Sequence, residues 1–163
     1  MQTVAETLQA ALELERRGRQ LYLEVADRVV DPVIKAVLVA LANDEQAHEN
    51  VISRYYHALE KHQAWPAVDS GLKPGTSIKR IKQILEGTAG KIGTDATFLS
   101  VYESARDLEL RSRDFYRSQA NAADDRQVVE LFRFLASLEQ AHLEALELVV
   151  EATRKAAETE PRV

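Results

Sequence analysis

The chain has 163 residues, of which 45% are hydrophobic and 29% charged, and this length favours one domain with a buried core. Because it contains no cysteine, disulfide scaffolds, thiolate zinc sites, cysteine-held iron–sulfur clusters and cysteine nucleophiles are excluded. With a net charge of −5, the chain has no overall positive field to attract nucleic acid or an anionic membrane, and no stretch is apolar enough to span a bilayer. We therefore expect a cytoplasmic protein that binds neither nucleic acid nor a membrane.

Helix signals predict two pairs of long helices joined by a crossover. The first hairpin covers residues 3–63, with helices over 3–30 and 32–63, because Asp31 is a good N-cap and Pro32 suits the first helical position. The crossover covers 64–94, holds five of the six glycines, and contains an amphipathic piece over 77–85 that suits a short helix. The second hairpin covers 95–158, with helices over 95–121 and 124–158; Asp124 or Asp125 is the cap, and the last residues fray.

The second hairpin is a copy of the first. The residues that recur 94 positions later are Leu14, Glu15, Arg17, Arg19, Tyr22, Leu41, Ala42, Glu45, Gln46, Ala47 and His48. Since the repeat runs without a gap, it predicts an all-α fold, a single-domain four-helix bundle made of two repeated hairpins with an approximate internal twofold axis.

Each long helix has an apolar stripe with the spacing that faces a bundle core, and a glutamate lies in each stripe. In the first and third helices the stripes are Val4, Leu8, Ala11, Glu15, Gly18, Tyr22, Val25 and Val29, and Phe98, Tyr102, Ala105, Glu109, Ser112, Tyr116 and Gln119. In the second and fourth they are Ile34, Leu38, Leu41, Glu45, His48, Ile52 and Tyr55, and Val128, Phe132, Leu135, Glu139, His142, Leu146 and Val149.

Helix geometry places these polar residues at one height. Glu15 lies 16 residues before Asp31 and Glu45 lies 14 after it, so both are roughly 21–24 Å from the same turn at about 1.5 Å of rise per residue. The same count holds in the second hairpin, where Glu109 and Glu139 each lie 15 residues from Asp124. The twofold axis then brings four glutamates and two histidines to one level of the core.

Four buried carboxylates repel one another, and two divalent cations would neutralise them. We therefore predict a dinuclear metal site in which Glu45 and Glu139 bridge the metals, Glu15 and Glu109 are terminal ligands, and His48 and His142 each bind one metal. Carboxylate and imidazole suit iron or manganese, and the same constellation occurs in di-iron and di-manganese bundles. Gly18 and Ser112, one turn beyond two of the glutamates, either leave room at the site or ease helix packing.

With these motifs the sequence resembles the rubrerythrin-like branch of the ferritin-like superfamily. The resemblance rests on Glu15-x6-Tyr22 with Glu45-x-x-His48 and on Glu109-x6-Tyr116 with Glu139-x-x-His142, and it covers nearly the whole chain. It implies a ferritin-like bundle with a non-haem centre of two iron ions, manganese or a mixed pair being the alternatives, and a homo-oligomer such as a dimer. It also implies that Tyr22 and Tyr116 either hydrogen-bond a metal ligand across the bundle or fill core volume.

Two departures from the family pattern affect the function. Typical rubrerythrins carry a cysteine-rich rubredoxin domain that supplies electrons, and we expect this chain to resemble the shorter, erythrin-type members that lack it. Many members also have a further carboxylate one turn beyond the third-helix ligand, where this chain has Ser112.

The leading hypothesis is a di-iron oxidoreductase of the peroxidase type that protects against oxidative stress. It would reduce hydrogen peroxide or dioxygen with electrons from an external donor, such as a rubredoxin or a reductase. A ferroxidase or iron-handling protein, a bundle whose metals are structural or stored, and a di-iron oxygenase are the alternatives.

Overall fold

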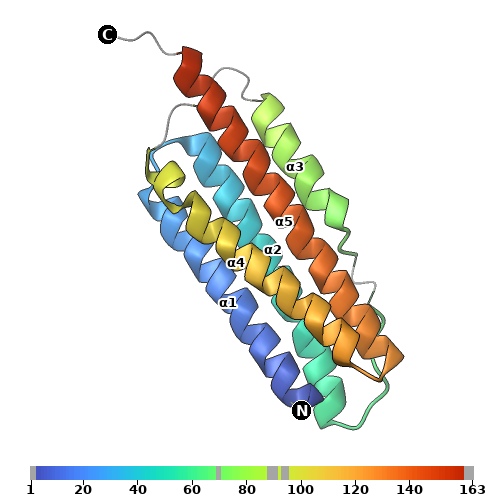
Figure 1. The fold of residues 1–163 in the computed structure, drawn as a ribbon. Coiled ribbons are helices and arrows are strands. Elements are labelled where there is room, and N and C mark those ends of the chain that lie inside the picture. Colours follow the sequence, from blue (N-terminus) through green and yellow to red (C-terminus); the bar gives the residue numbers. More distant parts are fainter. Residues whose placement is uncertain (1–2, 69–70, 88–91, 93–95, 160–163) are drawn as a thin grey trace.

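The computed structural model describes residues 3–68, 71–87, 92 and 96–159. Within these residues the fold is all helical: α1 (Val4–Arg28), α2 (Pro32–Glu60), α3 (Pro74–Gly87), α4 (Ala96–Ala122) and α5 (Arg126–Thr159). The first two helices form one hairpin and the last two form the other, and together they make a four-helix bundle (Figure 1). The predicted fold class is confirmed.

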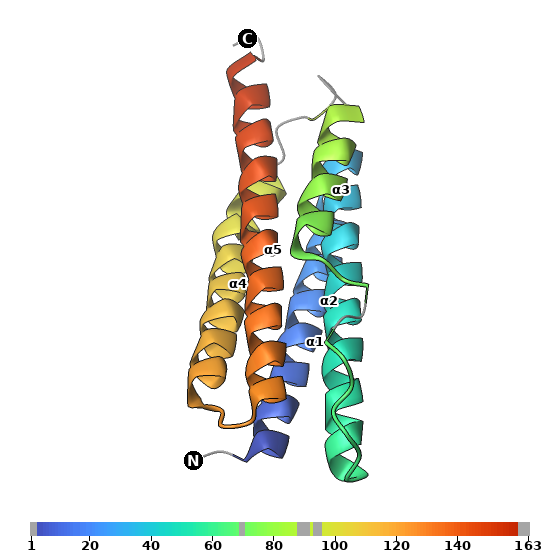
Figure 2. The same cartoon turned by 90° about the vertical axis from the view of Figure 1, so that its right-hand side faces the viewer.

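The crossover contains a helix that lies outside the four-helix bundle. α3 packs against α2 and α5, so it covers one side of the bundle (Figure 2). It includes the amphipathic piece predicted over 77–85 and extends beyond it at both ends. Ser77 and Ile81 are the residues by which this helix is buried.

The helix ends differ from the predicted boundaries by a few residues, for local reasons. α1 ends at Arg28 because Val29 adopts an extended backbone, and α2 ends at Glu60, three residues early, just before His62 with its φ of 51°. α5 begins at Arg126 because the Asp125 carboxylate accepts from the backbone N–H groups of the next turn. The predicted helix start at residue 95 and the frayed end after 159 lie outside the described residues.

The core consists of two apolar clusters separated by a polar layer. One cluster contains Tyr22 and Val25 of α1 with Leu38 of α2, and the other contains Leu8 of α1 with Ile52 of α2. The glutamates and histidines of the stripes lie between them in sequence on all four long helices. All predicted stripe residues are buried except those at two helix ends, Val4 and Gln119, which are partly buried. No helix in the described part of the chain is both long and apolar enough to cross a membrane.

The turn between α1 and α2 sets the relative height of the first two glutamates, and Asp31 stabilises it. Its carboxylate accepts hydrogen bonds from the backbone N–H groups of Val33 at 2.7 Å and Ile34 at 3.0 Å.

We predict that Asp31→Ala lowers the free energy of unfolding by about 0.5–2 kcal/mol in urea denaturation, whereas Asp31→Asn, which also caps well, stays close to wild type. An alanine variant as stable as wild type would contradict this account of the turn.

Candidate metal centre

The six side chains predicted as metal ligands lie together in the middle of the bundle. Each of the four long helices contributes one glutamate, and α2 and α5 each add a histidine one turn further on. All six are between 1% and 3% exposed, so the cluster is closed off from solvent in the described structure: Glu15, Glu45, His48, Glu109, Glu139 and His142.

The cluster divides into two overlapping groups, each able to hold a metal ion. The first consists of Glu15, Glu45, His48 and Glu139, and the second of Glu45, Glu109, Glu139 and His142; in each group the donor atoms lie within 4.8 Å of one another. Glu45 and Glu139 belong to both groups. This is the arrangement that two metals bridged by two carboxylates would need, with one further glutamate and one histidine for each metal.

Both histidines turn the same ring nitrogen toward the carboxylates. His48 Nδ1 lies 3.1 Å from Glu15 Oε2 and 3.3 Å from Glu139 Oε1. His142 Nδ1 lies 3.3 Å from Glu45 Oε1 and 3.5 Å from Glu109 Oε2. The two rings stack with centroids 5.0 Å apart, so the two groups are close neighbours.

The two tyrosines connect the hairpins at the site. The Tyr22 hydroxyl of the first hairpin donates to Glu109 Oε1 of the second, and the Tyr116 hydroxyl donates to Glu15 Oε1 of the first. Burial, reinforced by the neighbouring carboxylates, raises the pKa of both hydroxyls well above the usual value, so they stay protonated and serve as donors. Each tyrosine therefore holds one oxygen of a glutamate from the opposite hairpin, while the other oxygen of that glutamate faces a histidine of the cluster.

The crowded carboxylates perturb one another's proton affinity. Burial, followed by the charge of Glu45, raises the pKa of Glu15 to about 8, and burial with three neighbouring carboxylates raises the pKa of Glu139 well above its usual value. Burial opposes charge on the histidines, but the surrounding carboxylates outweigh it and raise the pKa of His48 and His142. Protons on these groups offset part of the negative charge when no metal does.

Among the described residues, several buried atoms of the cluster have no hydrogen-bond partner, although buried polar atoms are normally paired. They are Glu109 Oε2, Glu139 Oε1, and both ring nitrogens of His142. Three of these four atoms face the interior of the two groups, where a cation would satisfy them. The donor set and its unpaired atoms thus fit a metal site of carboxylates and imidazoles.

Gly18 gives Glu45 its space. A Cβ at this position would lie 2.9 Å from Glu45 Oε1 and 3.1 Å from its Cδ, closer than side chains normally approach. Of the two roles predicted for this glycine, leaving room at the site therefore has direct geometric support. Ser112, its counterpart in the repeat, is also buried, at 6% exposed.

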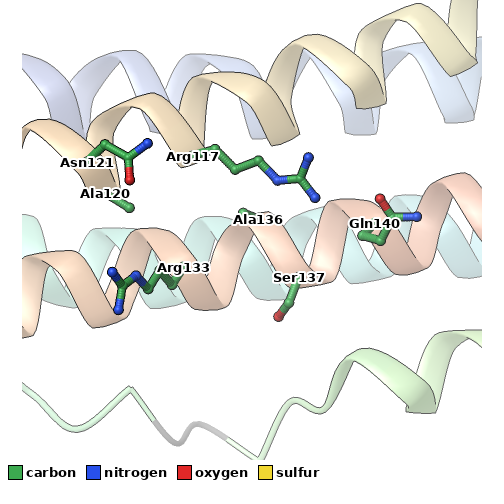
Figure 3. A pocket seen from close by; sticks show the side chains of 7 residues that line it. All are labelled: Arg117, Ala120, Asn121, Arg133, Ala136, Ser137 and Gln140. Atoms are coloured by element: carbon green, nitrogen blue, oxygen red, sulfur yellow. The ribbon is translucent and has the colours of Figure 1, made fainter.

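A surface hollow between α4 and α5 is separate from the cluster (Figure 3). It has a volume of about 440 Å³ and is lined by residues such as Arg117, Arg133 and Gln140, and by none of the six predicted ligands. Its position on the outer face of these two helices excludes it as the metal site.

Three further polar residues, which were not predicted, connect the cluster to the crossover helix α3. Asp44 precedes Glu45 on α2, is largely buried, and contacts Ser77 and Arg80 of the crossover helix α3. Burial alone would raise the pKa of Asp44, but its contacts with His142, Ser77 and Arg80 outweigh it and lower the pKa to about 2. The one signal in the sequence was a break in the repeat, because the counterpart of Asp44 is the apolar Leu138.

Comparison with known proteins identifies one family. The sequence model of the family described as Rubrerythrin matches residues 6–148, a range that contains all six residues of the cluster. No curated protein and no solved structure matches the chain.

Substitution of Gly18 tests the space available to Glu45. We predict that Gly18→Ala weakens binding of Co²⁺, measured by titration of the metal-free protein, because the new methyl group displaces one of the shared carboxylates. The metal-free variant keeps its stability or gains up to about 1 kcal/mol, since alanine favours a helix and the end of a glutamate can move. Gly75→Ala, where a Cβ meets nothing within 4 Å, serves as the control and should bind Co²⁺ like wild type. Equal affinity of the two variants would exclude this role for Gly18.

The raised pKa values predict that metal binding releases protons. At pH 7 the Glu15 carboxyl, with a pKa of about 8, still holds its proton, and bound metal requires the deprotonated ligand. Affinity for Co²⁺ should therefore fall as the pH is lowered from 8 to 6, by about tenfold per pH unit for each proton displaced. Calorimetry in buffers with different ionisation enthalpies counts the protons. An affinity that does not change between these pH values would refute the assigned protonation.

Proposed function

The chain belongs to the rubrerythrin family, and from this premise we propose that its buried cluster binds two iron ions and reduces hydrogen peroxide or dioxygen. The observation that carries the proposal is the pair of overlapping groups sharing Glu45 and Glu139. Two separate metal sites would not need common ligands, whereas a dinuclear centre does.

Charge supports two divalent ions rather than one. The cluster contains four carboxylates, and two neutral imidazoles add no charge, so two divalent cations balance the site when all ligands are deprotonated. We assign Glu15 and His48 to one ion, Glu109 and His142 to the other, and the two shared glutamates to both.

When bound by these residues, two ferrous ions would supply two electrons, the number needed to convert one hydrogen peroxide and two protons into two molecules of water. The protein's own residues hold the site in place for this chemistry. Tyr22 and Tyr116 fix one oxygen of each terminal glutamate through hydrogen bonds that cross between the hairpins. The surrounding apolar clusters exclude bulk water, which strengthens the electrostatic attraction between the carboxylates and the ions.

Retention of the metals distinguishes this proposal from iron handling. Every proposed ligand is at most 3% exposed, and each terminal glutamate is tied to the opposite hairpin by a tyrosine. An iron-handling centre must instead release oxidised iron in each cycle. The closed cluster therefore favours a centre that keeps its ions and is reduced again by a donor.

The electrons for a second cycle come from outside this sequence. None of the 163 residues is a cysteine, so no thiolate of this chain can hold an electron-transfer iron centre. We propose a separate donor protein, such as a rubredoxin or a reductase.

The test uses protein loaded with Fe²⁺ under anaerobic conditions and treated with hydrogen peroxide. We expect one peroxide to be consumed per two irons, the iron to remain bound through gel filtration, and added reductant to restore the reaction. Glu15→Gln should lower both bound iron and peroxide consumption, whereas the control Glu13→Gln, on an exposed face of the same helix, should behave like wild type. Oxidised iron that leaves the protein, or turnover of many irons per chain, would refute the proposal in favour of ferroxidase activity.

A further inference from the structure

A chain of polar contacts connects the crossover helix α3 to one histidine of the cluster. Ser77 Oγ donates to Asp44 Oδ2 at 2.7 Å, and Arg80 Nη2 lies 2.5 Å from Oδ1 and 2.6 Å from Oδ2 of the same carboxylate. On its other side, Asp44 Oδ2 lies 3.7 Å from His142 Nε2. The proposed reaction does not use Asp44, Ser77 or Arg80, so their arrangement needs a separate explanation.

The two nitrogens of His142 face in different directions. Nδ1 faces the carboxylates of Glu45 and Glu109, and Nε2 faces Asp44. An imidazole that binds a metal through Nδ1 carries its proton on Nε2, and this N–H then requires an acceptor. Within the described part of the chain, neither nitrogen has a hydrogen-bond partner. Asp44 Oδ2 is the oxygen placed to accept a hydrogen bond from the Nε2–H if a metal binds Nδ1.

Asp44 is itself fixed from α3. A carboxylate on a free aspartate can rotate, but here Arg80 contacts both oxygens and Ser77 binds one of them. Ser77 is 7% exposed and Ile81 is fully buried, so this part of α3 is held against the bundle. The guanidinium also compensates the charge of Asp44, which lies largely out of solvent.

In the other half of the cluster, an aspartate equivalent to Asp44 is missing. The residue that corresponds to Asp44 in the second hairpin is Leu138, which is buried and apolar. Each ion pair described for His48 runs through Nδ1, to Glu15, Glu45 and Glu139. α3 has no counterpart in the repeat, and it packs on one side of the bundle, against α2 and α5 (Figure 2).

We propose that α3 is a positioning element for one of the two metal positions: Ser77 and Arg80 hold Asp44, and Asp44 orients His142. The position made by His142 and Glu109 then binds its ion more tightly than the position made by His48 and Glu15. The inference rests on the proposed function only in requiring that the cluster binds two metals. It does not depend on the reaction that follows.

Titration of the metal-free protein with Co²⁺ tests the proposal, because cobalt accepts the same ligands and gives a visible spectrum. Wild type should bind two ions with different affinities. Arg80→Gln and Ser77→Ala should weaken the tighter step by about 10-fold to 100-fold and leave the weaker step unchanged. The control is Arg126→Gln, which breaks an ion pair of 3.0 Å between Arg126 and Glu130 near the start of α5, several turns from the proposed ligands of that helix. It should leave both steps unchanged.

A second measurement separates positioning from general stability. In the Co²⁺-loaded protein, the Nε2 proton of each bound histidine gives a strongly shifted, exchangeable proton resonance. We expect the His142 proton to exchange slowly with solvent in wild type and faster in Asp44→Ala, with the His48 proton unaffected. Thermal melting of the metal-free variants shows whether each one folds; if Arg80→Gln does not, Ser77→Ala, which removes a single hydrogen bond, carries the test.

Three outcomes would overturn the proposal: variants that bind both ions like wild type, variants that weaken both steps equally, or a wild-type protein that binds no Co²⁺. Failure of the proposed function looks different. A protein that binds two ions with the expected pattern in the variants but does not consume peroxide retains the positioning role of α3 and loses the assigned reaction. If instead the protein reduces peroxide but Arg80→Gln binds both ions like wild type, the assigned reaction stands and the positioning role of α3 is refuted.

Discussion

The burial of four carboxylates in one layer is the constraint on which this structure depends. Removing carboxylates from water is unfavourable, and placing them within reach of each other adds repulsion. The two apolar clusters on either side of the layer contribute the favourable burial that allows the bundle to hold it. In the metal-free protein, protons on Glu15 and Glu139 and positive charge on the histidines reduce the repulsion. Cations would remove it directly, so metal affinity and the electrostatic cost of folding are linked.

The polar layer also explains why the two hairpins depend on each other. Each group of potential ligands draws a glutamate from the opposite hairpin, and each tyrosine donates to a carboxylate across the interface. A single hairpin would therefore contain three residues of one group and one of the other, and its tyrosine hydroxyl would lack the carboxylate that accepts its hydrogen bond. The duplication supplies two similar halves, but the site forms only between them.

Periodicity made the helices and the polar layer predictable from the sequence. The repeat and the apolar stripes predicted which residues face the core, and of the 29 predicted positions in the four stripes only Val4 and Gln119 are not buried. The contact of α3 with Asp44 was not predictable, because a crossover without a repeat offers no register against the bundle. For Gly18, the sequence allowed two roles, and the 2.9 Å approach to Glu45 became visible only in three dimensions. Side-chain contacts between distant segments leave no periodic signal.

Duplication alone would give two equivalent metal positions, so any difference must come from residues that the repeat does not share. The exchange of Asp44 for Leu138 is one such difference, and α3 is another. They act at the same place, because the carboxylate present in one half is the group that Ser77 and Arg80 contact. A buried aspartate without these partners would add a fifth negative charge beside the cluster. Asp44 and α3 therefore act together in this proposal. Arg80 and Ser77 of α3 compensate the charge of the buried carboxylate, and the carboxylate makes the two halves of the site unequal.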